Sequence, residues 1–177
     1  MASDRSLYRK IEVVLDIAKS INIVSLRELR SEIQGRKPSL FFSRQYNRDT
    51  DQFDEEISER IIQKTVHVCH VLGLLAEDGS LTPAGREALR KTRFDAVVGG
   101  LVRKFLRERD INFDRLNEII RKQMQGSPPI LPTSEALWQA IGTKMSKGTF
   151  SRMLTLLARC GAARSAQRRI YLRFEVG

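Results

Sequence analysis

Apolar residues recur every three or four positions along much of the chain, which is the pattern of amphipathic helices. In the first half this pattern predicts helices over 6–20, 25–33, 51–72 and 83–91. Ser25, followed three residues later by Glu28, is typical of the capping box that begins a helix. Residues 34–50 contain Gly35 and Pro38 and have no helical period, so they are expected to form a loop.

A short hairpin is predicted between the last two of these helices. The segment LLAEDGSLT contains Asp78-Gly79, a dipeptide typical of tight β-turns. Gly73 is expected to end the preceding helix, and Thr82 followed by Pro83 is typical of the start of the next one.

The second half repeats this order of elements. Helices are predicted over 94–110, 113–125, 134–142 and 149–161. A proline-rich break, a turn and two strands around a tight loop are predicted over 126–133, 143–148 and 162–174. Both halves therefore have a helix, a short helix, a helix that ends in glycine, and a hairpin.

This order resembles the winged-helix branch of the helix-turn-helix superfamily, present twice. The stretches that carry the resemblance are LGLLAEDGSLTPAGREAL and IGTKMSKGTFSRMLTLLARCGAA. It implies a mainly α fold with small β-hairpin wings, in two tandem winged-helix domains over 1–92 and 93–177. It also implies that Leu74 and Leu81 pack the first wing onto the helices, and that residues 83–110 join the two domains.

The chain is basic, with a formal net charge of +10, and most of the excess lies in its second half. Residues 1–93 hold 16 Lys or Arg and 14 Asp or Glu, whereas residues 94–177 hold 15 and 7. Positive charge favours polyanionic partners. The second domain is therefore the one expected to bind nucleic acid.

In winged helices that read DNA, the third helix enters the major groove and the wing contacts the backbone or minor groove. In the second domain the residues expected at these contacts are basic or small and polar: Lys144, Ser146, Lys147, Thr149, Ser151, Arg152, Thr155, Arg164, Gln167, Arg168 and Arg169. Lysines and hydroxyl groups suit phosphates, and an arginine can also bind guanine. Phe150, Met153, Leu154 and Leu157 fall on the other face and are expected in the core. A solvated basic face without a partner is the alternative.

The first domain has the opposite charge where its third helix is expected to begin. The acidic residues there would be repelled by phosphates: Asp51, Asp54, Glu55, Glu56 and Glu59. A protein-contact or homodimer role is therefore expected for this domain, through the apolar edges of 6–20 and 83–110. The segment 35–48 mixes basic and aromatic residues, a combination that can bind phosphates and stack bases. A loop held to the core by Phe41 and Phe42 is the preferred interpretation.

Nothing in the sequence combines a nucleophile, a base and an oxyanion site, and no glycine-rich phosphate loop is present. The glycine pair at 99–100 lies in a helical pattern and is expected to let another helix approach closely. His67 and His70 lie one helical turn apart with Cys69 on another face, which supplies too few ligands for a metal. Cys69 and Cys160 are expected to be reduced, buried thiols. We therefore expect no catalysis, no metal and no cofactor.

These observations predict a protein that binds double-stranded DNA, either a transcription regulator or an accessory factor of a DNA-processing system. The alternative is a structural adaptor subunit that binds other proteins in a chromosome-associated or nucleic-acid-processing complex. RNA binding would use the same charges. No apolar run approaches the roughly 20 residues of a membrane span, and the N-terminus has no signal-peptide core. A cytoplasmic location is expected, with nucleoid association in a prokaryote.

Overall fold

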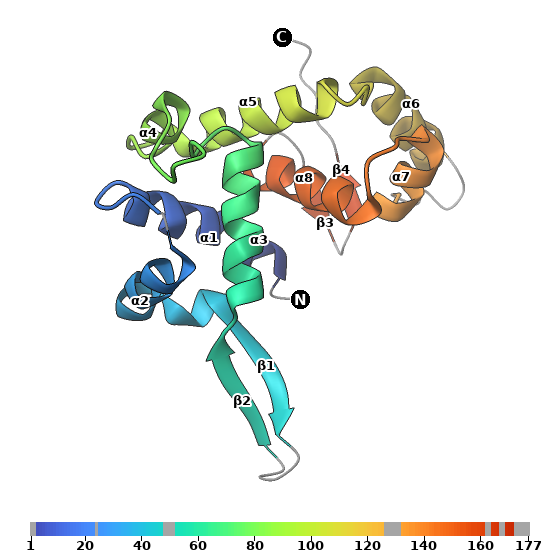
Figure 1. Cartoon of the computed structure of the whole chain (residues 1–177). Coiled ribbons are helices and arrows are strands. Elements are labelled where there is room, and N and C mark those ends of the chain that lie inside the picture. The colour runs from blue at the N-terminus through green and yellow to red at the C-terminus, as the bar shows by residue number, and fades with distance from the viewer. Residues whose placement is uncertain are drawn as a thin grey trace. The chain divides into compact units, whose positions relative to one another are not determined.

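The computed structural model is mainly helical with small antiparallel hairpins, as the sequence predicts (Figure 1). It describes residues 3–23, 25–47, 52–125, 132–161, 164–166 and 169–171. The chain divides into two compact units, Met1–Lys91 and Thr92–Gly177, which we call unit 1 and unit 2. None of the helices in the described part of the chain is long and apolar enough to cross a membrane.

Unit 1 contains α1 (Ser3–Ala18), α2 (Leu26–Arg36), a short 3-10 helix η1 (Pro38–Phe41), β1 (Phe42–Asn47), β2 (Gln52–Ile57), α3 (Glu59–Val71) and α4 (Pro83–Ala88). Helix α1 packs against α2 and α3. Its stripe of Ile11, Val14 and Leu15 is fully buried, which confirms the predicted helix face. Ser25 begins α2 as predicted, because its Oγ accepts the Glu28 N–H at 3.1 Å.

Residues between α2 and α3 fold differently from the prediction. Helix α2 continues to Arg36, and η1 leads into an antiparallel hairpin in which Phe42 lies opposite Ile57. In Figure 1 this hairpin extends away from α1, α2 and α3. Phe41 is fully buried, as expected, and holds the base of the hairpin to the core, whereas Phe42 is only partly buried. The loop predicted over 34–50 is therefore wrong.

The helix predicted from residue 51 is also wrong, because α3 begins only at Glu59. Ser58 has an extended backbone with φ −85° and ψ 114°, and it separates β2 from the helix. Asp54, Glu55 and Glu56 therefore lie on a strand and not at the start of the third helix. Asp51 falls outside the described residues.

A compact turn joins α3 to α4. Gly73 has a φ of 68° and ends α3, as predicted. In place of the two expected strands, Leu75 pairs with Leu81 in an isolated bridge. The Gly79 carbonyl accepts the Ile23 N–H at 3.1 Å, so the tip of the turn is bonded to the segment after α1. Leu81 is buried, as is Leu74, which confirms that this turn packs on the helices.

Thr82 connects the turn to α4 through its side chain. Its Oγ1 accepts the Gly85 N–H at 3.0 Å and donates to the Gly73 carbonyl at 2.6 Å. Thr82→Ala is expected to lower the free energy of unfolding by about 1–2 kcal/mol, because both bonds are lost. Urea denaturation checks this. Thr82→Ser is the control, because it keeps the hydroxyl group and should stay close to the native value. Equal losses in the two variants would show that the cap is not responsible.

Unit 2 contains α5 (Phe94–Arg107), α6 (Phe113–Met124), α7 (Ser134–Ile141), α8 (Lys147–Arg159), β3 (Arg164–Ala166) and β4 (Arg169–Tyr171). Helix α8 packs against α5 and α7, and both strands contact it. The α5–α8 contact is close at Gly99, where an added Cβ would lie 3.2 Å from Cys160 Cβ. Gly99 therefore admits a helix closely, as expected, whereas Gly100 has no atom within 4 Å of an added Cβ and does not. Helix α4 ends at Ala88 and α5 begins at Phe94, which confirms two separate helices within the predicted ranges 83–91 and 94–110.

Candidate nucleic-acid interface

A short turn joins α7 to α8. A side-chain hydrogen bond caps the first residues of each helix. Thr133 begins α7 by accepting the Ala136 N–H at 3.1 Å, and Ser146 begins α8 by accepting the Thr149 N–H at 3.3 Å. The turn is further held by the Trp138 indole, whose N–H donates to the Met145 carbonyl at 2.7 Å. Helix α8 therefore begins at Lys147, two residues earlier than predicted, in a fixed position relative to α7.

Helix α8 has two different faces. Phe150, Met153, Leu154 and Leu157 are at most 2% exposed, which confirms the predicted core face. The polar residues predicted from the sequence lie on the rest of the α8 surface or in the turn before it. Lys144, Ser146 and Lys147 are exposed, whereas Thr149, Ser151, Arg152 and Thr155 are partly exposed.

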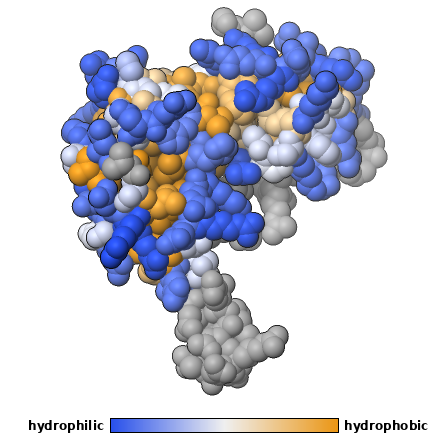
Figure 2. Space-filling model, viewed as in Figure 1, coloured by the Kyte–Doolittle hydropathy of each residue, from blue (hydrophilic) through white to orange (hydrophobic). Residues whose placement is uncertain are grey.

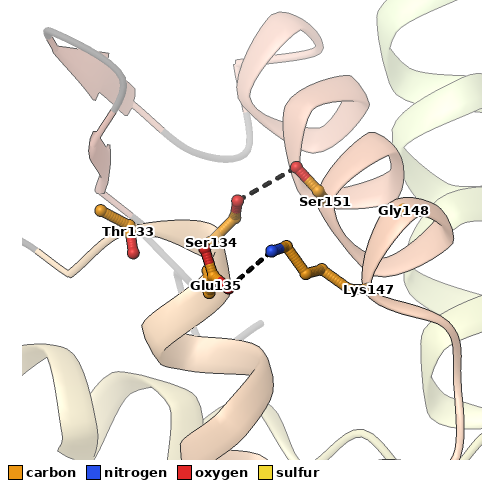
Figure 3. Close-up of a pocket in the computed structure, with 6 residues that line it drawn as sticks. All are labelled: Thr133, Ser134, Glu135, Lys147, Gly148 and Ser151. Atoms are coloured by element: carbon orange, nitrogen blue, oxygen red, sulfur yellow. Dashed lines mark hydrogen bonds and ion pairs between the residues drawn. The ribbon is translucent and has the colours of Figure 1, made fainter.

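The first turns of α7 and α8 enclose an open hollow of about 510 Å³ (Figure 3). Two contacts cross it. The Lys147 ammonium lies 2.5 Å from a Glu135 carboxylate oxygen, and the Ser151 and Ser134 hydroxyl oxygens lie 3.0 Å apart. Both members of the ion pair are about half exposed, 52% for the lysine and 51% for the glutamate. Such a pair contributes only about 0–1 kcal/mol, so another anion can replace the carboxylate easily.

Other predicted residues on α8 have partners within the helix. Arg152 Nε donates to the Gly148 carbonyl at 3.0 Å, which leaves the terminal guanidinium nitrogens available. The Thr155 hydroxyl donates to the Ser151 carbonyl at 2.9 Å. The Ser146 hydroxyl donates to Thr149 Oγ1 at 3.0 Å. Lysine and arginine are therefore the side chains of this surface with most capacity for an external ligand.

The structure describes two of the four residues predicted for the wing. Arg164 lies in β3 and Arg169 in β4, and the register pairs Ala166 with Arg169. Gln167 and Arg168 lie outside the described residues. Both strands contact α8, so the hairpin lies against that helix.

Sequence reasoning missed Ser134 and Glu135 as part of this site. An acidic residue in the first turn of a helix is common because it complements the helix dipole, so Glu135 gave no separate signal. Its contact with Lys147 crosses the turn between two helices, and helical periodicity carries no information on such pairs. The signal that could have indicated it is charge: Glu135 is one of only two Asp or Glu residues in 132–177, among eight Lys or Arg.

Figure 2 shows hydrophilic residues over much of the displayed surface of unit 2.

In the described residues no group of three or more His, Cys, Asp or Glu side chains is placed to hold a metal ion. Burial raises the pKa of the Cys69 thiol to about 12, so it stays protonated at neutral pH. Burial likewise raises the pKa of Cys160 to about 12, with a smaller contribution from the Asp95 charge. Both thiols are free; Cys69 is buried, as expected, whereas Cys160 is only partly buried.

No family model matches the chain, and searches of curated proteins and of solved structures found no match either.

Proposed function

We propose that the protein binds double-stranded DNA through the start of α8 and the β3–β4 hairpin of unit 2. The observation that carries this proposal is the surface formed by the first two turns of α8. It presents Lys147 and Arg152 on a polar face, while the opposite face of the same helix is fully packed. A rigid helix with cations at its N-terminal end suits entry into the major groove.

The surrounding elements support the same function. The order α7, turn, α8 and hairpin is that of the winged-helix domains that the sequence resembles. The segment from α7 to the end of the chain carries eight Lys or Arg against two Asp or Glu. Phosphate contacts by such residues account for most non-specific affinity for DNA. A role as a transcription regulator or as an accessory factor in DNA processing fits this mode of binding.

Binding of the full chain to a fluorescent, random-sequence DNA duplex tests the proposal. Fluorescence anisotropy across a salt series is expected to show affinity that falls steeply with salt, because bound phosphates release counterions. Duplex RNA of the same sequence is the competitor. RNA that displaces DNA at equal concentration would argue against a preference for DNA. No binding of either duplex at low salt would contradict the proposal.

Glu135→Gln is expected to strengthen duplex binding by about two- to fivefold at low salt, because an exposed charge of this kind contributes about 1 kcal/mol or less. The substitution removes a carboxylate that repels phosphate and competes for Lys147. Glu118→Gln on α6 is the matched control, since Glu118 is exposed and pairs with Lys122 at 2.7 Å in the same way. Anisotropy titration of both variants is the measurement. Equal effects would mean that only net charge matters.

A structural adaptor that binds another protein is the alternative, and one observation on unit 1 favours it. Figure 2 shows hydrophobic residues reaching the surface of this unit between hydrophilic ones. On α3, Ile61, Val66 and Val71 are only partly buried. Exposed apolar patches can mark protein contacts. If the chain fails to bind duplexes, protein partners captured through unit 1 are the expected ligands.

A further inference from the structure

A second hollow lies on unit 2, where the corner between α5 and α6 meets the turn between α7 and α8. Its volume is about 500 Å³. Arg109 and Asp110 line it from the corner, and Thr143 and Lys144 line it from the turn. Two cationic side chains from different parts of the sequence therefore border one cavity.

The arginine is held in place by buried groups. The Arg109 guanidinium carbon lies 3.6 Å from the centroid of the Phe105 ring, and Nη1 donates to the Phe105 carbonyl at 3.2 Å. The corner itself closes through the Ile111 N–H, which donates to the Leu106 carbonyl at 3.1 Å, with Asp110 in the left-handed conformation at φ 57°. One guanidinium N–H is used in this arrangement, and the others remain available to a ligand.

The lysine is carried by the turn that precedes α8. Thr143 Oγ1 accepts the Met145 N–H at 3.1 Å, and the Trp138 bond to the Met145 carbonyl holds the same turn. Within the described residues, no ion pair joins Lys144 or Arg109 to a carboxylate, in contrast to Lys147. The positive charge of this hollow is opposed only by Asp110 among its lining residues.

We propose that Arg109 and Lys144 together bind a phosphodiester of the DNA duplex. The proposal rests on the proposed function and extends the interface from the start of α8 to the α5–α6 corner. A stacked, pre-ordered arginine loses little conformational freedom when it binds phosphate, and the lysine adds a second charge. Contacts of this kind fix the register of a protein on the duplex without reading its sequence. Asp110 weakens the same contact, because its carboxylate repels phosphate.

Two substitutions with opposite expected effects test this site in the full chain. Arg109→Gln is expected to weaken binding of a random-sequence DNA duplex about five- to tenfold and to lower the salt slope by about one. Asp110→Asn is expected to strengthen binding about two- to fivefold. Asparagine tolerates the left-handed backbone as aspartate does, so this change alters charge and not the corner. Arg109→Lys keeps the charge but loses the stacked guanidinium, so its affinity is expected to lie between those of the native chain and Arg109→Gln.

Arg121→Gln is the control, since Arg121 is exposed on α6 and does not line the hollow. It should leave the salt slope close to that of the native chain. If the native chain binds and Arg109→Gln behaves like Arg121→Gln, the phosphate site is overturned while the proposed function stands. If the native chain does not bind the duplex at low salt, the proposed function fails and the phosphate site fails with it. A thermal melt of each variant separates lost binding from lost folding.

Discussion

Replacing Lys147 and Arg152 together by alanine is expected to weaken binding of random-sequence duplex DNA by about ten- to a hundredfold at low salt. The slope of the logarithm of the affinity against the logarithm of the salt concentration should fall by about two. Lys147 is held only by a half-exposed ion pair, and Arg152 uses one nitrogen within the helix. Both are therefore free to contact phosphates or base edges. Alanine has the highest helix propensity, so α8 should keep its structure.

The matched control is Arg60→Ala with Lys64→Ala on α3, which removes the same charge from two exposed positions near the start of a helix. Its affinity should stay within about twofold of the native value, because Arg60 and Lys64 belong to unit 1 and are not part of the proposed surface. Anisotropy titrations of both double variants measure the two affinities and show whether the surface of α8 is required for binding. A similar loss in the two would mean that net charge, and not the surface of α8, binds the duplex.

Gly79→Ala is expected to lower the free energy of unfolding by about 3 kcal/mol or more, because strain and a steric clash occur together. Gly79 has a φ of 76°, a conformation that side chains disfavour. An added Cβ would lie 2.1 Å from the Ile23 carbonyl oxygen and 2.5 Å from the carbonyl carbon. These are backbone atoms, so relief requires moving the turn and breaking the bond between Ile23 and Gly79. Urea denaturation followed by circular dichroism measures the effect.

Substitutions at two other glycines separate the contribution of backbone strain from that of the steric clash. Gly73 has a φ of 68° but no atom within 4 Å of an added Cβ, so Gly73→Ala carries strain alone and should cost about 1–2 kcal/mol. Gly100 lies within α5, also with no atom within 4 Å, and Gly100→Ala should stabilise by up to about 1 kcal/mol. Equal stability of the Gly79 and Gly73 variants would show that the turn does not dock against Ile23.

Helices with a clear apolar period and a recognisable cap were predictable from the sequence. The Ser25 and Thr82 caps and the buried face of α8 follow from local patterns that the structure confirms. The hairpin β1–β2 is not indicated by the sequence because β2, the strand next to α3, contains Asp54, Glu55 and Glu56. Acidic residues favour helix starts, so the helix was extended backwards through them. Phe53 and Ile57 would share one face of a strand, but Glu55 between them is charged, so no period-two alternation of apolar and polar residues indicates the strand.

The charged residues of the candidate interface were predictable from the sequence, but the contacts between side chains of different helices were not. Helical periodicity places Phe150, Leu154 and Leu157 on one face of the helix and leaves Arg152 and Thr155 on the other, so it identifies which residues reach solvent. The contact of Glu135 with Lys147 and the shared hollow of Arg109 and Lys144 depend on how separate helices meet. Such contacts are set by packing of the whole unit, and local sequence does not encode them.

Amide hydrogen exchange of the full chain, with and without saturating duplex DNA, tests the location of binding most directly. The first amides of a helix exchange readily because they have no carbonyl partner within it. We predict that the duplex slows exchange over 143–152 and 164–171 and leaves 59–71 on α3 unchanged. Protection confined to unit 1, or none in unit 2 when the duplex is bound, would contradict the account.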